Sequence, residues 1–240
     1  MALVTDEHSA SHSIKLPIRE QFLERTIVEF GQAGPGAFNP GKIARELGVT
    51  VAMINHYFGS RYGLIAEAAY VVYARYIDEM FEAITDAPRV PEERLRAWIQ
   101  TQISVARRVG AWGMVLNYPT LALKESLALD PKYRTLMSAK FEVNLARLAQ
   151  LVLDVKSGTV SPTEITDESG DLKRFLSNPT LVALASSIAM STLGAAVWMA
   201  GSHAPSADSE DAHQRAEFVV QSHINHLVQQ VKNYDLNINV

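Results

Sequence analysis

The sequence predicts an all-α protein. Apolar residues recur at helical spacing in almost every segment, residues that start or stop helices separate these segments, and no alternating strand pattern is present. The 240 residues can form one large domain, or a small domain and a larger one. With 48% apolar and 20% charged residues, the composition is that of a globular protein.

The first expected helix begins at Pro17, after residues 1–16, a polar stretch that we expect to be a mobile arm. Its apolar residues include Ile18, Phe22 and Phe30, which recur at helical spacing. Glycine at position 31 and in the GPG sequence that follows is expected to end this helix.

Residues 39–61, NPGKIARELGVTVAMINHYFGSR, predict two short helices joined by a tight turn. Asn39 is placed to cap the first helix, and Thr50 is placed to cap the second. Gly48 lies at the bend, where a positive φ is easiest for glycine. The pair Ile54 and Phe58, four residues apart, gives the second helix a buried face. This spacing is that of a helix-turn-helix.

Longer helices are expected after this window. Ser60 can cap a long helix that ends before Pro88, and Pro91 opens another that runs to about Arg108. A shorter helix is expected near Pro119. The remaining helices are expected over 131–157, ended by Gly158, and over 179–200 and 208–234, with a loop after Gly158 that holds one capped turn at 161–164.

Residues 178–203 carry no charge and are long enough to span a membrane. Serine, threonine, glycine and alanine dilute the stretch, and it lacks a strong Leu/Ile/Phe run. We therefore expect the buried helix of a water-soluble protein rather than a membrane protein. The N-terminus lacks a basic flank and an apolar run, so no secretory signal is predicted, and we expect a cytoplasmic protein.

The absence of cysteine excludes disulfides, thiolate metal sites and a cysteine nucleophile. His223 and His226 lie three residues apart, with His213 upstream, but few acids stand at matching offsets, so we expect neither a metal nor a cofactor. Charges such as Glu67, Arg107 and Glu142 are expected to be lone charges and belong to no catalytic motif, so an enzyme is not expected.

Residues 17–64 resemble the DNA-binding domain of the TetR/AcrR family of bacterial transcriptional regulators. The resemblance is carried by Ile43-Ala44, GVT at 48–50, Ile54, NHYF at 55–58, Arg61 and Leu64. It implies a DNA-binding domain over 17–64 and a helical effector-binding and dimerisation domain over 65–240. The function implied is that of a repressor released from a palindromic operator by a small, largely apolar ligand. The alternative is an all-helical enzyme or small-molecule binding protein.

The resemblance also implies residue roles. Thr50 would contact a phosphate, Arg61 stands where the family usually carries a phosphate-binding lysine, and Tyr57 would pack or touch the DNA backbone. Asn55 occupies a position where the family often has tyrosine, which leaves it as a base reader. With Ile54 buried, the outward face can read bases, because asparagine pairs with adenine and Val or Ala contacts thymine methyls. The candidate DNA-binding residues are Asn39, Thr50, Val51, Ala52, Asn55, His56, Tyr57 and Arg61.

The predicted DNA-binding region is only weakly basic. The whole chain has a formal charge of −4, and residues 15–61 hold six basic and four acidic residues, which gives +2. We therefore expect binding to depend on a homodimer that spans two half-sites. The last two helices are the expected interface, through the small residues Ala185, Ala189, Gly194 and Ala196 and an apolar stripe of Val219, Ile224, Leu227, Val228 and Val231.

A set of aromatic and amide residues in the central helices suits either a pocket for an unknown small-molecule effector or a filled core. The candidates are Tyr73, Trp98, Gln102, Trp112, Asn117, Tyr118, Phe141, Asn144 and Trp198.

Overall fold

The structure is a computed structural model that describes residues 16–108, 112, 131–162, 165, 172–200 and 210–236, without the side chains of 35, 107, 197–200, 210–213 and 215. Every regular element in this part is a helix, so the predicted all-α class is confirmed. The helices are α1 (Ile18–Ala37), α2 (Pro40–Glu46), α3 (Ala52–Phe58), α4 (Arg61–Asp86), α5 (Pro91–Arg108), α8 (Pro131–Ser157), α9 (Leu172–Leu176), α10 (Pro179–Ala200) and α11 (Glu210–Asn233).

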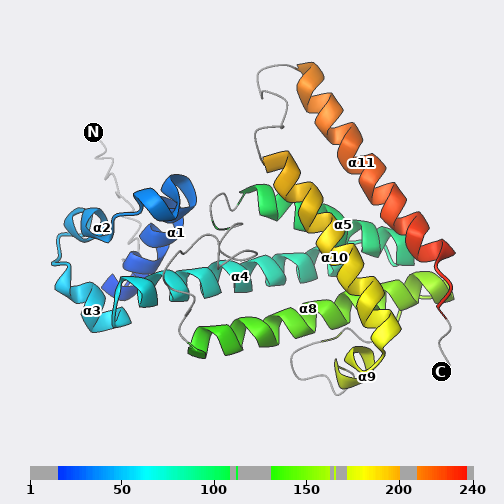
Figure 1. The fold of residues 1–240 in the computed structure, drawn as a ribbon, viewed down its shortest axis with the longest axis horizontal. Helices are drawn as coiled ribbons and strands as arrows, with labels where there is room; N and C mark the ends of the chain where they lie inside the picture. The colour runs from blue at the N-terminus through cyan, green and yellow to red at the C-terminus, as the bar shows by residue number, and fades with distance from the viewer. Residues whose placement is uncertain are drawn as a thin grey trace, which may run out of the picture.

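Helices α1 to α3 form a three-helix unit at one end of the molecule, and α4 leads from this unit along the long axis (Figure 1). Helix α8 runs beside α4, and α5 packs against both. Helix α10 crosses α5 and α8, and α11 packs on α5 and α8 at the far side of the molecule. The three-helix unit is therefore attached to the helical body chiefly through α4.

Two apolar cores share helix α4. The first holds Phe22, Phe30 and Ile54 from the three-helix unit, and residues of the first part of α4 from Leu64 to Val72 complete it. The second holds Met80 and Ile84 near the other end of α4, together with apolar residues of α5, α8, α10 and α11. Helix α4 therefore connects the core of the three-helix unit to the core of the helical body.

Most expected helix boundaries are confirmed. Ser60 caps α4, since its hydroxyl accepts the backbone N–H of Gly63 at 3.0 Å. Helix α5 begins at Pro91, and α8 ends before Gly158, whose φ is +70°.

Two local expectations were wrong. Helical structure passes Gly31, where an end was expected, and breaks only at Gly34 of the GPG sequence, whose φ is +73°, before it resumes as far as Ala37. Helix α3 begins at Ala52, with Val51 at the N-cap and no side-chain capping bond; Thr50 contributes its carbonyl, which accepts the N–H of Met53. A short helix, α9, begins at Leu172, directly after the segment predicted to be a loop, where no element was predicted.

The helix expected near Pro119 lies outside the described residues, as does part of the turn expected at 161–164.

Helix α10 is long and apolar enough over Pro179–Ala196 to cross a membrane, with a mean hydropathy of 1.4. One face is buried against α5 and α8 through Leu181, Leu184 and Ile188, which recur at helical spacing. The opposite face is exposed and includes Met190 and Ser191. The buried face of α10 therefore forms part of the core of the helical body.

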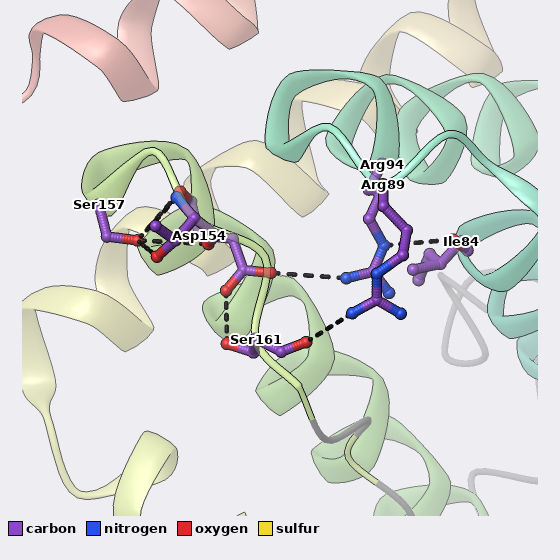
Figure 2. Close-up of polar contacts among 7 residues, drawn as sticks. Ile84, Arg89, Arg94, Asp154, Ser157 and Ser161 are labelled. Carbon is purple, nitrogen blue, oxygen red and sulfur yellow. Dashed lines mark hydrogen bonds and ion pairs between the residues drawn. The ribbon is translucent and has the colours of Figure 1, made fainter.

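A buried polar cluster joins α4, α5 and α8 at the end of the body remote from the three-helix unit (Figure 2). The Arg94 guanidinium lies 3.5 Å from the Asp154 carboxylate and donates to the carbonyl of Ile84 at 3.3 Å. Asp154 also accepts the Ser161 hydroxyl at 2.6 Å. Both charged side chains are almost fully buried, so this contact compensates charge that water cannot reach.

Candidate nucleic-acid interface

The second helix of the helix-turn-helix, α3, turns one polar face outward. Ile54 is buried, whereas Val51, Ala52, Asn55 and His56 are all exposed. Val51 is an apolar side chain with 52% of its surface exposed. The face expected to read bases is therefore exposed to solvent.

The turn that presents α3 depends on backbone geometry at glycine. Gly48 has a φ of +70° between α2 and α3, as expected from its position. Gly63 was not singled out from the sequence: a Cβ there would lie 1.9 Å from the carbonyl oxygen of Phe58. Glycine at this position therefore lets α4 start directly against the end of α3.

Polar candidates flank α3 on both sides. The Asn39 side chain accepts the backbone N–H groups of Gly41 and Lys42 at 3.0 and 3.4 Å, so it caps α2 as expected. Thr50 is exposed immediately before α3. The exposed Arg61 donates to the Phe38 carbonyl at 3.1 Å, and its guanidinium lies 5.6 Å from the Phe38 ring centroid. This contact holds Arg61 at the start of α4.

Aromatic contacts fix the end of α3. The ring of Tyr57 lies edge-on to His56 at 5.0 Å and to Phe58 at 6.2 Å. Tyr57 and Phe58 are both only partly buried, so Phe58 is less enclosed than its predicted role as a core residue implied. Phe58 also lies 5.2 Å below the guanidinium of Arg19 and packs at right angles to Phe22.

The positive charge of the three-helix unit is partly neutralised. The ammonium of Lys42 lies 2.8 Å from the carboxylate of Glu29, and this hydrogen bond raises the pKa of Lys42. Arg45 and Arg25 are exposed. The weakly basic balance seen in the sequence is therefore retained on the folded surface.

Glu67 connects the three-helix unit to the helical body. It lies in α4 with 8% of its surface exposed, and its carboxylate accepts from Arg19 of α1 at 2.5 Å and from the Tyr133 hydroxyl of α8 at 2.6 Å. The expectation that Glu67 is a lone charge was wrong. Its partners are 48 and 66 residues away, so no local sequence pattern could reveal them.

The candidate ligand residues do not gather at one place. Trp98, Gln102 and Asn144 lie in the buried core, where the Trp98 indole donates to the Asn144 carbonyl oxygen at 3.2 Å. Phe141 is half exposed, and Tyr73 is partly buried, which raises its pKa. Asn117 and Tyr118 lie outside the described residues, and so does the side chain of Trp198.

Trp112 packs in the first core instead. Its ring stacks on Phe30 at 4.2 Å, and its indole N–H donates to the Ile27 carbonyl at 2.8 Å. It also lines a cavity of about 440 Å³ between α1, α4 and α5. A further cavity of about 510 Å³ lies between α5 and α11. The other described candidates line neither of these two cavities.

The small and apolar residues expected at a dimer interface mostly face the chain's own core. Ala185 and Ala196 are fully buried, and so are Ile224, Leu227, Val228 and Val231. These residues pack against α5 and α8 within the same chain. An amphipathic helix is stable only when its apolar face is covered, and here the chain's own helices cover it. Gly194, Val219 and the neighbouring Phe218, which is 73% exposed, remain available to a partner.

Comparison with known proteins identifies the helix-turn-helix. Residues 22–68 match the family model described as bacterial regulatory proteins of the tetR family. No curated protein sequence matches the chain.

Solved structures extend the likeness to the whole chain. A TetR/AcrR family transcriptional regulator from Thermobifida fusca YX-ER1 has a TM-score of 0.58 at 17% identity, covering 91% of this chain and 99% of its own. FadR from Bacillus subtilis in complex with stearoyl-CoA has a TM-score of 0.54 at 15% identity, and the match covers 89% of this chain and 97% of FadR. AibR in complex with isovaleryl coenzyme A and operator DNA has a TM-score of 0.53 at 16% identity, and the match covers 86% of this chain and 97% of AibR.

At these identities the structural likeness establishes the fold, whereas the family model identifies the helix-turn-helix itself. Residues 22–68 thus match the tetR family model, and the described helices have the fold of solved TetR/AcrR transcriptional regulators.

Proposed function

We propose that this protein is a cytoplasmic homodimeric repressor that binds a palindromic DNA operator through α3 and is released by a small-molecule effector. The observation that carries the proposal is the exposed face of α3, where Val51, Ala52, Asn55 and His56 lie together above a buried Ile54. A helix of this shape fits the major groove of DNA.

Base recognition is assigned to the outward face and phosphate contact to its flanks. The Asn55 amide can bond adenine at two positions, and the Val51 and Ala52 methyl groups suit thymine. Thr50 and Arg61 lie before and after α3, where they would fix its register on the DNA backbone without reading sequence. Asn39 and Tyr57 support the positions of α2 and α3 and are proposed to approach the backbone.

Dimerisation through α10 and α11 follows from the weak charge of one unit. Two linked units release counterions from two half-sites and gain affinity that one unit lacks. On α10 and α11 the exposed Gly194, Met190, Phe218 and Val219 offer small and apolar contacts. The partner residues are thus those left outward after the chain's own core is filled.

Effector control is supported by the shared helix α4. An effector that packs better when α4 is displaced would shift the protein toward a state in which the two α3 helices no longer match groove spacing. Two solved structures with this fold hold an acyl-CoA, which supports an effector-binding role for the helical body.

The test is selection of bound sequences from a random double-stranded DNA pool with the purified full-length protein. A palindromic consensus with half-sites about one helical turn apart is expected. The control is Glu82→Ala, which changes an exposed residue of α4 outside the helix-turn-helix and the proposed dimer helices, and it should select the same consensus. The variant Asn55→Ala/His56→Ala should lose the consensus. Absence of any enrichment with the unmodified protein would overturn the proposal.

A further inference from the structure

The cavity between α1, α4 and α5 has an apolar floor and a charged mouth. Its floor is formed by Ile27, Val72, Val105 and Trp112, and Arg75 and Arg108 also line it. The volume of about 440 Å³ lies within the usual range of small-molecule sites. At about 30 Å³ per water-sized unit, it accommodates a ligand of roughly a dozen heavy atoms or slightly more.

Both arginines at the mouth are engaged in exposed ion pairs. Arg75 of α4 holds both carboxylate oxygens of Glu24 on α1, and this hydrogen bonding raises the pKa of Arg75. Arg108 of α5 contacts both carboxylate oxygens of Glu79 on α4, at 2.7 and 2.8 Å, through a single guanidinium nitrogen. The four side chains are between 41% and 60% exposed.

In such exposed ion pairs, the anionic group of a ligand can replace the carboxylate at little cost in free energy. An ion pair between solvated side chains contributes about 0 to 1 kcal/mol, because water and salt compensate both charges. A displaced Glu24 or Glu79 would remain solvated, so its release costs little. Each guanidinium also has five N–H donors, so an anion can bind beside or in place of the carboxylate.

We infer that this cavity is a binding site for an amphipathic anion, a single apolar chain of about ten carbons that ends in a carboxylate or phosphate. The chain would lie against Ile27, Val72 and Trp112, and the anionic head would bind Arg75 and Arg108. The inference rests on the proposed function for its consequence: the head would compete with Glu24 and so release one ionic contact between α1 and α4.

The cavity is lined by residues of both the three-helix unit and the helical body. Ile27 and Val28 belong to α1, in the three-helix unit, whereas Arg108 belongs to α5, in the helical body. A ligand here therefore contacts both parts at once. It does not depend on the aromatic residues that the sequence first indicated, apart from Trp112.

The experiment is calorimetric titration of the full-length protein, without DNA, using decanoate, decyl phosphate and decanol below their aggregation concentrations. One-to-one binding of at least one anionic probe, at least about tenfold tighter than decanol, is expected from the charge-assisted bonds. The two anions distinguish a carboxylate site from a phosphate site. Equal binding of decanol, or no saturable binding of any probe, would overturn the inference.

Variants locate the site. Arg75→Met/Arg108→Met should weaken binding of the anion about tenfold or more, whereas Arg174→Met, which removes an exposed arginine of α9, should leave it unchanged. Val28→Trp adds bulk at an exposed position of the rim, so it should block binding while both arginines and the core remain. Binding that survives both the double variant and Val28→Trp would place the ligand elsewhere and contradict the inference.

A second measurement separates the two proposals. The same anion is added to the complex of the protein with its selected operator, and release is followed by fluorescence anisotropy. If the protein selects an operator but binds no anionic probe, the cavity inference alone is refuted. Anion binding by a protein that selects no DNA would refute the proposed function alone, and the site would remain.

Discussion

The carboxylate of Glu67 in α4 lies 2.6 Å from the hydroxyl of Tyr133 in α8, while its other oxygen binds Arg19 of α1. One buried side chain thus joins the three-helix unit to the helical body. Because a carboxylate with 8% exposure has little access to water, it depends on these two donors.

Glu67→Gln is expected to lower the free energy of unfolding by about 1.5 kcal/mol. This is the lower end of the range for hydrogen bonds to charged groups, because the Arg19 side chain is itself partly solvated. Tyr133→Phe should cost less, and the two changes should be non-additive in urea unfolding because they share one contact. Glu82→Gln, at an exposed position of the same helix, is the control. Additive effects would show that the contact is absent in solution.

Asp154→Ala is expected to destabilise the protein by about 1.5 to 3 kcal/mol, because it removes buried charge-assisted contacts to Arg94 and Ser161. The loss should appear as a lower midpoint of thermal unfolding. Asp86→Ala, at the exposed end of α4, should change stability by less than about 0.5 kcal/mol. If both variants behaved alike, the Arg94–Asp154 contact would not be a buried pair.

Arg61→Ala is expected to weaken binding to all DNA sequences alike and to reduce the slope of log affinity against log salt by about one. Arg61 also donates to the Phe38 carbonyl, so the thermal midpoint should be recorded beside the affinity. Arg174→Ala removes the same charge far from α3 and should leave both quantities unchanged. A loss restricted to particular operator positions would make Arg61 a base reader instead.

Asn55→Ala is expected to relax the preference at one base pair of each half-site by about 1 to 3 kcal/mol, while affinity for random DNA is retained. His56→Ala should act on a neighbouring base pair, because both side chains are exposed on the same face of α3. Competition binding with single-base operator variants measures the effect. A uniform loss over all sequences would assign these residues to the phosphate backbone.

His223 is expected to make stability depend on pH. Its Nε2 is buried without a hydrogen-bond partner, and burial, followed by the nearby charge of His226, lowers its pKa. The unfolded chain then binds more protons near and below pH 6.5, so the free energy of unfolding falls as the pH falls through the lowered pKa. His223→Asn should remove this part of the dependence in urea unfolding between pH 7.5 and 5, and exposed His226→Asn should remove much less.

Much of the fold is encoded locally in the sequence. Pro91, Pro131 and Pro179 each stand at the first position of a helix, and Ser60 and Asn39 cap helices as expected. These signals act within one turn of the chain, so they can be recognised without tertiary structure. The same holds for the exposed face of α3, because one buried residue fixes the orientation of its neighbours.

Interactions between distant segments could not be predicted in this way. Glu67 had no local partner, yet the fold brings it to Arg19 and Tyr133. Trp112, grouped by composition with an effector pocket, stacks on Phe30 of the three-helix unit. The small and apolar residues of α10 and α11 that suited a dimer are mostly covered by the chain's own helices.

The sequence by itself therefore determined most of the helices, the helix-turn-helix and its match to the tetR family model, because spacing and capping are local properties of the chain. Only the tertiary structure decided which apolar faces remain exposed, which charges are paired and where cavities lie. Those properties depend on packing between residues that are far apart in sequence, and the cavity shared by α1, α4 and α5 is the clearest example.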